Sequence, residues 1–159
     1  MIPILVRERY PQVANVANTN QLVAQRLTEL GIRYSRGRKA VIDALTNADG
    51  PRSAAELHRD LAEAVPLSSL YRTLAVLTDA DVVTMHHGSR GITRYELSEW
   101  LAGHHHHLVC LSCGTVDDIT PPPALEADLE SVVISLTVAG RFSPKGHSLE
   151  IEGLCSECA

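Results

Sequence analysis

Apolar residues recur every three or four positions through roughly the first half of the chain, which is the spacing of one face of an α-helix. The pattern predicts helices over Thr19–Leu30 and Arg36–Ala48, a third that begins at Ser53, and a fourth over Leu67–Ala80. The third helix has the clearest start signal, because Ser53 and Glu56 are spaced to form a capping box at a helix N-terminus. In the fourth helix, the spacing of the leucines places one face, which includes Leu67, against the core.

Beyond Ala80 the apolar positions alternate with polar ones, which is typical of strands. Val82–His86 and Ile92–Leu97 are predicted to pair as a hairpin across a glycine-containing turn. Helices followed by such a hairpin have the layout of a winged helix-turn-helix domain, whose recognition helix lies just before the wing. We therefore expect a DNA-binding domain over residues 19–97, preceded by a flexible tail over residues 1–18, which lack periodicity.

The second half of the chain predicts a smaller α/β module over residues 104–159, joined to the first by a hinge at residues 98–103. Strands are expected over His105–Leu111, Gly114–Ile119 and His147–Gly153, and a helix begins in the proline-rich stretch 120–123 with Leu125 and Val132 facing inward. The overall fold class is therefore α+β. A module of this size is too small for a large core, so we expect a zinc staple or a partner chain to support it.

Charge is distributed unevenly between the two halves. The chain carries a net charge of −5, but residues 1–97 have a balance of +2 and residues 98–159 a balance of −7. Such asymmetry favours two modules with different partners, and a mildly basic module is able to bind DNA if its cations lie on one face. No apolar run reaches the length of a membrane span and we find no targeting signal, so we expect a cytoplasmic protein without a membrane partner.

All four cysteines fall in two C-x-x-C pairs, Cys110 with Cys113 and Cys155 with Cys158. Two such pairs are able to meet in space as one tetrahedral four-thiolate zinc site. Disulfides are the alternative interpretation. A two-residue gap closes a small, strained ring, however, and the chain shows no secretory leader. We therefore favour structural zinc.

Four consecutive histidines, His104 to His107, run directly into the first cysteine pair. If this segment is a strand, its side chains alternate between two faces. His105 and His107 then point to one side, and His104 and His106 to the other. One strand would supply two imidazoles to each of two separate metal sites. A solvated loop or the remnant of a tag is the alternative, although a tag lies at a terminus and this run is internal.

A zinc enzyme is a competing hypothesis for these ligands. Zinc hydrolases keep one coordination position open to water and place a general base nearby. The sequence has no H-E-x-x-H motif and no carboxylate adjacent to the histidine run. A zinc ion held by four thiolates is closed to water, so we expect neither catalysis nor a small organic ligand.

Taken together, several motifs resemble the ferric uptake regulator family of metal-dependent bacterial repressors. They are Leu70–Leu74 in the fourth helix, His104–Cys113, His147–Leu149 and Cys155–Cys158. The uninterrupted histidine run is most similar to the zinc uptake regulators of that family. The resemblance covers about residues 19–159. It implies an N-terminal winged helix-turn-helix domain, a C-terminal small α/β dimerisation domain, and a homodimer that binds double-stranded operator DNA.

The resemblance also implies three sets of metal ligands. A structural zinc would be held by Cys110, Cys113, Cys155 and Cys158. A site inside the dimerisation domain would use His104, His106, Glu126 and His147. A regulatory site between the domains would use His105 and His107, with further ligands among Glu96, His86 and His87. For these last three a solvated surface role is the alternative, and for Glu126 the alternative is a first-turn charge that favours the helix dipole.

The chain mixes features of two branches of the family. Iron-binding members place a histidine just before the third helix, where this chain has Pro51 or Arg52, and zinc-binding members usually place a cysteine where it has Ser98. Glu96 resembles the carboxylate of iron-type members. The regulatory ion is therefore zinc, which we favour, or iron.

The family's mode of action implies a metal-responsive repressor that controls metal-uptake genes. A regulatory ion that bridges the domains would fix their relative angle, and with it the distance between two recognition helices in a homodimer. The residues expected to face DNA are Ser68, Tyr71, Arg72 and Thr73 on the fourth helix and Arg36, Arg38 and Lys39 on the second. A peroxide sensor of the same family, in which bound iron oxidises its own ligands, is the alternative.

Overall fold

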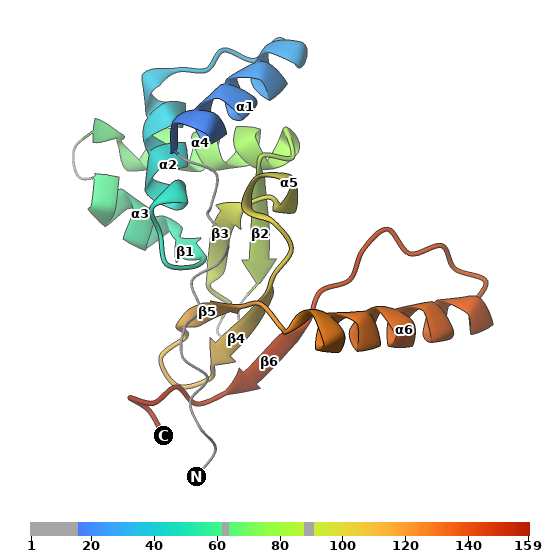
Figure 1. Cartoon of the computed structure of the whole chain (residues 1–159). Helices are drawn as coiled ribbons and strands as arrows, with labels where there is room; N and C mark the ends of the chain where they lie inside the picture. Colours follow the sequence, from blue (N-terminus) through green and yellow to red (C-terminus); the bar gives the residue numbers. More distant parts are fainter. Residues whose placement is uncertain (1–15, 62–63, 88–90) are drawn as a thin grey trace.

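The chain folds as two modules stacked one below the other, with one long helix extending to the side (Figure 1). The computed structural model describes residues 16–61, 64–87 and 91–159, apart from the side chains of His87 and Ala139. The first module contains α1 (Val16–Glu29), α2 (Arg36–Thr46), β1 (Arg52–Ser53), α3 (Ala54–Leu61), α4 (Leu67–Asp79), β2 (Val83–His87) and β3 (Thr93–Leu97). Helix α1 begins three residues earlier than predicted, and the rest of the predicted tail lies outside the described residues.

A single hydrophobic core holds the helices of the first module to its sheet. Its fully buried side chains come from every helix, among them Leu27, Ile42, Leu57 and Leu74. Leu67 departs from the predicted inward stripe of α4. It is the first residue of that helix and 45% exposed, because it lies beyond the edge of the core.

The predicted capping box at the start of α3 is confirmed. The Ser53 backbone N–H donates to the Glu56 carboxylate at 2.7 Å, and the Glu56 N–H donates to the Ser53 hydroxyl at 3.2 Å. The Arg94 guanidinium on β3 also donates to Glu56 and to the carbonyl of Pro51, each at 3.0 Å. These bonds fasten the N-terminus of α3 to the wing.

The wing is a three-stranded sheet with the order β1-β3-β2. Strands β2 and β3 pair antiparallel, as the predicted hairpin requires, and residues 88–90 of its turn lie outside the described residues. The two-residue strand β1 pairs with β3 and was not predicted, because Arg52–Ser53 is too short to show a period.

A short helix, α5 (Glu99–Ala102), occupies most of the predicted hinge. Leu101 is buried in the core of the first module, and the Trp100 indole N–H donates to the carbonyl of Asp81 at 2.6 Å. Gly103 follows with φ of 84°, a backbone angle that favours glycine. The linking segment is thus anchored to the first module up to Ala102.

The second module contains β4 (His106–Cys110), β5 (Val116–Ile119), α6 (Pro123–Ala139) and β6 (Glu150–Gly153). Its sheet has the order β5-β4-β6, with β4 antiparallel to β5 and parallel to β6. Strand β4, which carries two of the four histidines, is therefore central and paired on both sides.

Helix α6 extends away from this sheet (Figure 1). Leu125 and Val132, which were predicted to face inward, are 52% and 54% exposed, because no described layer of the chain covers that face of the helix. Among the described residues, no helix combines the length and the apolar character needed to cross a bilayer.

Candidate metal centres

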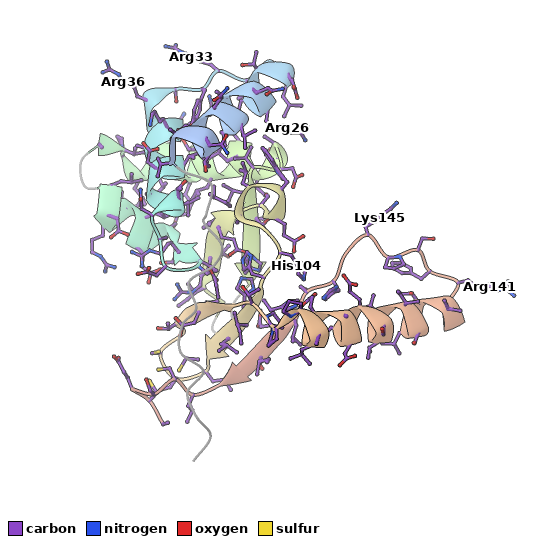
Figure 2. All side chains as sticks on the ribbon, viewed as in Figure 1. Arg26, Arg33, Arg36, His104, Arg141 and Lys145 are labelled. Atoms are coloured by element: carbon purple, nitrogen blue, oxygen red, sulfur yellow. The ribbon has the colours of Figure 1, made fainter. Side chains whose placement is uncertain are left out.

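Within the described part of the chain, three groups of side chains able to ligate metal gather in and around the second module. In each group the ligand atoms lie within 4.8 Å of one another. The alternation predicted for the histidine run is what the structure shows: His105 and His107 fall in one group, and His104 and His106 in another. Figure 2 shows His104 near the start of α6, close to the junction of the two modules.

The first group joins the two C-x-x-C pairs, Cys110 and Cys113 after β4 with Cys155 and Cys158 at the end of the chain. The structure describes all four cysteines and records them as free thiols. The sulfurs of Cys113 and Cys155 are 3.8 Å apart, which excludes an S–S bond of about 2.05 Å between them. Four thiolates around zinc at about 2.3 Å stand about 3.8 Å from one another, so this spacing fits a zinc site.

Electrostatics favour the thiolate form at the first cysteine pair. Backbone N–H groups of Cys113 and Cys155 lower the pKa of the Cys110 thiol to about 6. A hydrogen bond with Thr115 likewise lowers the pKa of Cys113. The thiolate is the form that ligates metal, and Cys110 and Cys113 favour it. Hydrogen bonds with the neighbouring thiols instead raise the pKa of Cys155 to about 11.

The second group surrounds Glu126 on the first turn of α6. Three imidazole Nε2 atoms converge on its carboxylate: those of His104 at 3.1 Å, His106 at 3.1 Å and His147 at 3.0 Å. The Nδ1 of His104 contacts the Glu99 carboxylate at 2.5 Å, which leaves its Nε2 lone pair for a metal. His106 differs, because the Leu149 N–H donates to its Nδ1 at 3.2 Å, and ligation through Nε2 would require that bond to break.

The third group lies where the two modules meet. Glu96 comes from the wing strand β3, whereas His105, His107 and Asp118 belong to the second module. One Glu96 oxygen is 3.0 Å from His105 Nε2 and 3.3 Å from His107 Nε2. The Nδ1 of His105 donates to the carbonyl of Gly103 at 2.9 Å, which fixes the ring with Nε2 facing the group.

His86 on β2 completes the surroundings of Glu96. Its Nε2 lies 2.5 Å from the second Glu96 oxygen, and its ring stacks edge-on against that of His107 with 4.5 Å between centroids. His87 pairs with Thr93 in the wing, but its side chain lies outside the described residues. The structure thus brings one of the two candidate wing histidines to the junction.

Asp118 was missed by the sequence reasoning. It lies directly opposite His107 in the β4–β5 pairing, and its carboxylate oxygen is 3.7 Å from His107 Nε2. The signal was present in the sequence: the expected strand over Gly114–Ile119 contains two adjacent aspartates after a histidine strand, so antiparallel pairing brings one of them beside an imidazole.

Burial and charge act against each other at the junction. Burial alone would raise the pKa of Glu96, but hydrogen bonds with His107 and His86 outweigh it and lower that pKa. For His107, burial would lower the pKa, and the Glu96 carboxylate raises it overall. Burial is also the main reason that the pKa of Asp118 rises to about 6.

Several buried polar atoms in these groups lie close to other polar atoms without hydrogen-bond geometry. Among the described residues, the oxygens Asp118 Oδ1 and Glu126 Oε1 and the nitrogen His147 Nε2 make no hydrogen bond, although His147 Nε2 lies 3.0 Å from the Glu126 carboxylate. An orphaned buried acceptor costs about 1–3 kcal/mol, which a bound cation would offset. Nitrogen and carboxylate donors of this kind suit a first-row divalent metal. The residues of both histidine groups therefore fit metal ions.

The residues predicted to face DNA lie on two helices of the first module. On α4, Ser68, Tyr71 and Arg72 are exposed and Thr73 is half-buried. On α2, Arg36 and Lys39 are exposed, with Lys39 paired to Asp43 at 2.8 Å, and the half-buried Arg38 donates to the carbonyl of Arg33. Figure 2 shows Arg33 and Arg36 at the outer end of the module, remote from His104.

A winged-helix module joined to an α/β module with clustered metal ligands defines a metal-binding, DNA-binding regulator. The sequence profile described as the Ferric uptake regulator family matches residues 29–151. A ferric uptake regulation protein of Bacillus subtilis is 31% identical over 141 residues, covering 86% of this chain and 91% of that protein. A zinc uptake regulation protein of Mycobacterium tuberculosis is 33% identical over 136 residues, covering 83% and 98%.

A solved structure has the same fold. The ferric uptake regulator of Helicobacter pylori, reported with three functional metal-binding sites, superimposes with a TM-score of 0.74 at 22% identity, over 92% of this chain and 95% of that one. This chain belongs to the Ferric uptake regulator family. It is a metal-responsive, DNA-binding transcriptional regulator and not an enzyme. Relatives named for iron and for zinc match almost equally, so membership of the zinc branch stays a prediction.

Proposed function

We propose that this chain is a homodimeric repressor of metal-uptake genes, which binds its operator when a divalent ion, zinc, occupies the group at the module junction. The observation that carries this proposal is the composition of that group. Glu96 and His86 come from the DNA-binding module, whereas His105, His107 and Asp118 come from the other module. An ion held there would add bonds between the modules.

The residues of the junction act by linking two modules whose chain connection runs through Gly103. The Glu96 carboxylate contacts the imidazoles of His86, His105 and His107. Asp118 adds a second carboxylate close by, which disfavours the closed arrangement until positive charge is present. The closed arrangement is then selected by whatever ion binds it better than the open one.

The homodimer is supported by the exposed apolar surface of α6 and β6. Leu136 and Val138 on α6 are 70% and 73% exposed, and Phe142, just after that helix, is 68% exposed. Every residue of the edge strand β6 is exposed, including Ile151. A soluble chain rarely leaves so much aliphatic surface in water, so a second copy is the partner we propose for it.

DNA contact is proposed for the exposed side of α4 and the start of α2. Tyr71 is 53% exposed on α4, and Arg72 beside it is exposed as well. Arg36 is well placed for the phosphate backbone, whereas Arg38 and Lys39 already bond within the module. In a dimer, the angle between modules sets the separation of the two α4 helices, which has to match the DNA repeat.

Zinc is proposed because three of the five side chains at the junction are imidazoles. Iron is the second candidate, and a specific observation favours it: two carboxylates, Glu96 and Asp118, share the site with His105 and His107. Histidine and carboxylate together are typical of ferrous sites. Peroxide treatment of iron-loaded protein followed by mass spectrometry distinguishes a peroxide sensor from a metal-sensing repressor. In a peroxide sensor, His105 or His107 would gain one oxygen.

The test of the function is a DNA-binding titration with metal. Double-stranded sites are selected from a random pool with zinc-loaded protein, and affinity is then measured with zinc, with ferrous iron, and after chelation of the exchangeable ion. We expect metal to raise affinity at least tenfold and His107→Ala to abolish the increase. His58→Ala is the matched control, because His58 lies outside all three ligand groups. Equal affinity with and without metal would reject the switch.

A further inference from the structure

We propose that Gly50 is a positioning residue of the switch: its missing side chain lets the turn after α2 sit directly on strand β5, and this contact carries the state of the metal junction to the DNA-binding helices. The inference rests on the proposed function, and it assigns a role to a residue outside the metal ligands and outside the DNA-facing residues.

The contact at Gly50 is unusually close. A Cβ atom at this position would lie 2.9 Å from the backbone carbonyl oxygen of Val116 and 3.6 Å from Asp118 Oδ1. Separations under 3.0 Å are essentially never seen for real Cβ atoms. The nearest atom, the Val116 carbonyl oxygen, has no side-chain rotation by which to move away, because it belongs to the backbone of a paired strand. Any larger residue would therefore have to push the turn and β5 apart.

Space, and not backbone conformation, is what requires glycine here. The glycines with positive φ in the described part of the chain are Gly31, Gly91, Gly103 and Gly114. Gly50 is outside that set, so an L-amino acid could adopt its backbone angles. A substitution at residue 50 is consequently a clean probe of the contact between the modules.

One end of the contact is tied firmly to the DNA-binding helices. Pro51, the next residue, is buried, and its carbonyl accepts from the Arg94 guanidinium at 3.0 Å. The same guanidinium donates to Glu56, which caps α3, and β1 follows at once in pairing with β3. The turn therefore moves with α2, α3 and the wing as one body.

The other end of the contact is the metal junction itself. Val116 and Asp118 lie on β5, and Asp118 stands across from His107 in the β4–β5 pairing. Strand β5, which lies against Gly50, is thus also the strand that carries the candidate ligand Asp118. Closing the junction brings β5 and the turn into contact, and separating them opens the junction, so the two events are coupled.

The test is Gly50→Ala, with Gly146→Ala as its matched control. A Cβ at residue 146 meets nothing within 4 Å, and that glycine likewise has no positive φ. Forcing a methyl group into a packed contact costs about 1–3 kcal/mol, which corresponds to a factor of about 5 to 150. We expect Gly50→Ala to weaken metal-dependent operator binding and zinc affinity at the junction by a similar factor in that range. Gly146→Ala should change neither.

A second measurement does not depend on the variant. In the wild-type protein, hydrogen exchange at residues 47–53 and 116–118 should slow when zinc is added, because the turn and β5 become mutually protected. Unchanged exchange would overturn the proposal, as would wild-type operator and zinc affinity in Gly50→Ala. If wild-type DNA binding itself ignores metal, the proposed function fails; if it responds and Gly50→Ala responds equally, only the role of Gly50 fails.

Discussion

The first module buries a continuous set of aliphatic side chains, whereas the second buries chiefly imidazole and sulfur. The hydrophobic cluster draws its members from α1 to α5 and the wing, up to Leu101. In the second module the buried residues of the described chain are His105, His106, His107, Val109, Cys110 and Val116. The difference teaches where each module can obtain stability: the first has apolar burial, and for the second we propose metal ligation.

The largest effect is expected from removing the four-thiolate site. Cys155→Ser should unfold the second module while the first keeps its helices, because structural zinc contributes about 10 kcal/mol or more in small zinc-dependent folds. Hydrogen exchange and zinc content measured on the same sample check this. Ser156→Ala is the control beside it. Full protection of β4 in zinc-free Cys155→Ser would show that the second module does not depend on the metal.

A cavity in the core of the first module should destabilise the protein less than loss of the four-thiolate site. Leu74→Ala removes a fully packed side chain, and we expect the free energy of unfolding to fall by about 2–5 kcal/mol with zinc still bound. Urea unfolding followed by helical circular dichroism measures it. Leu67→Ala is the control, because that leucine is 45% exposed and should cost less than about 1 kcal/mol. Equal losses in the two variants would contradict the core described for α4.

The second module is also expected to depend on its partner. Leu136→Asp places a charge in the exposed apolar surface of α6 and should weaken self-association by about thirtyfold or more, the effect of losing an interface hot spot. Sedimentation equilibrium checks this with zinc present. Glu130→Ala, an exposed change on the same helix, should leave association within about twofold. Unaltered association in Leu136→Asp would place the dimer contact elsewhere.

The smallest expected effect is at the cap of α3. Bonds from Ser53, with the charges of Arg94 and Arg52, lower the pKa of Glu56 against the opposing effect of burial, from an ordinary value of 4.5. A depressed folded-state pKa contributes stability above the unfolded value and loses it as pH falls. Glu56→Gln should therefore cost about 1 kcal/mol at pH 7.

The pH dependence of stability distinguishes the loss of the Glu56 charge from a general loss of stability in Glu56→Gln. The difference in unfolding free energy between wild type and Glu56→Gln should shrink as pH falls from 4.5 through the depressed folded-state pKa of Glu56, where the wild-type carboxylate becomes protonated. Thermal unfolding at a series of pH values measures it, with Glu29→Gln on the exposed end of α1 as a control. A difference that stays constant down to low pH would rule out the charge as its source.

Local signals in the sequence predicted much of the fold. The capping box of Ser53 and Glu56, the wing hairpin and the alternation of His104 to His107 all depend on neighbours along the chain, and the structure contains each of them. What the sequence reasoning missed depends on which segments pair or pack together. Asp118 becomes a candidate ligand through its pairing with His107 in the neighbouring strand, and Gly50 matters because β5 lies against it.

The placement of Trp100 has a practical consequence for following the molecule in solution. It is the chain's single tryptophan, it lies on α5, and its indole bonds to Asp81 while its side chain stays partly open to water. Emission from that one indole therefore originates next to the segment about which we propose that the two modules turn. The protein carries its own optical reporter, and stopped-flow fluorescence could time the closing motion without any added label.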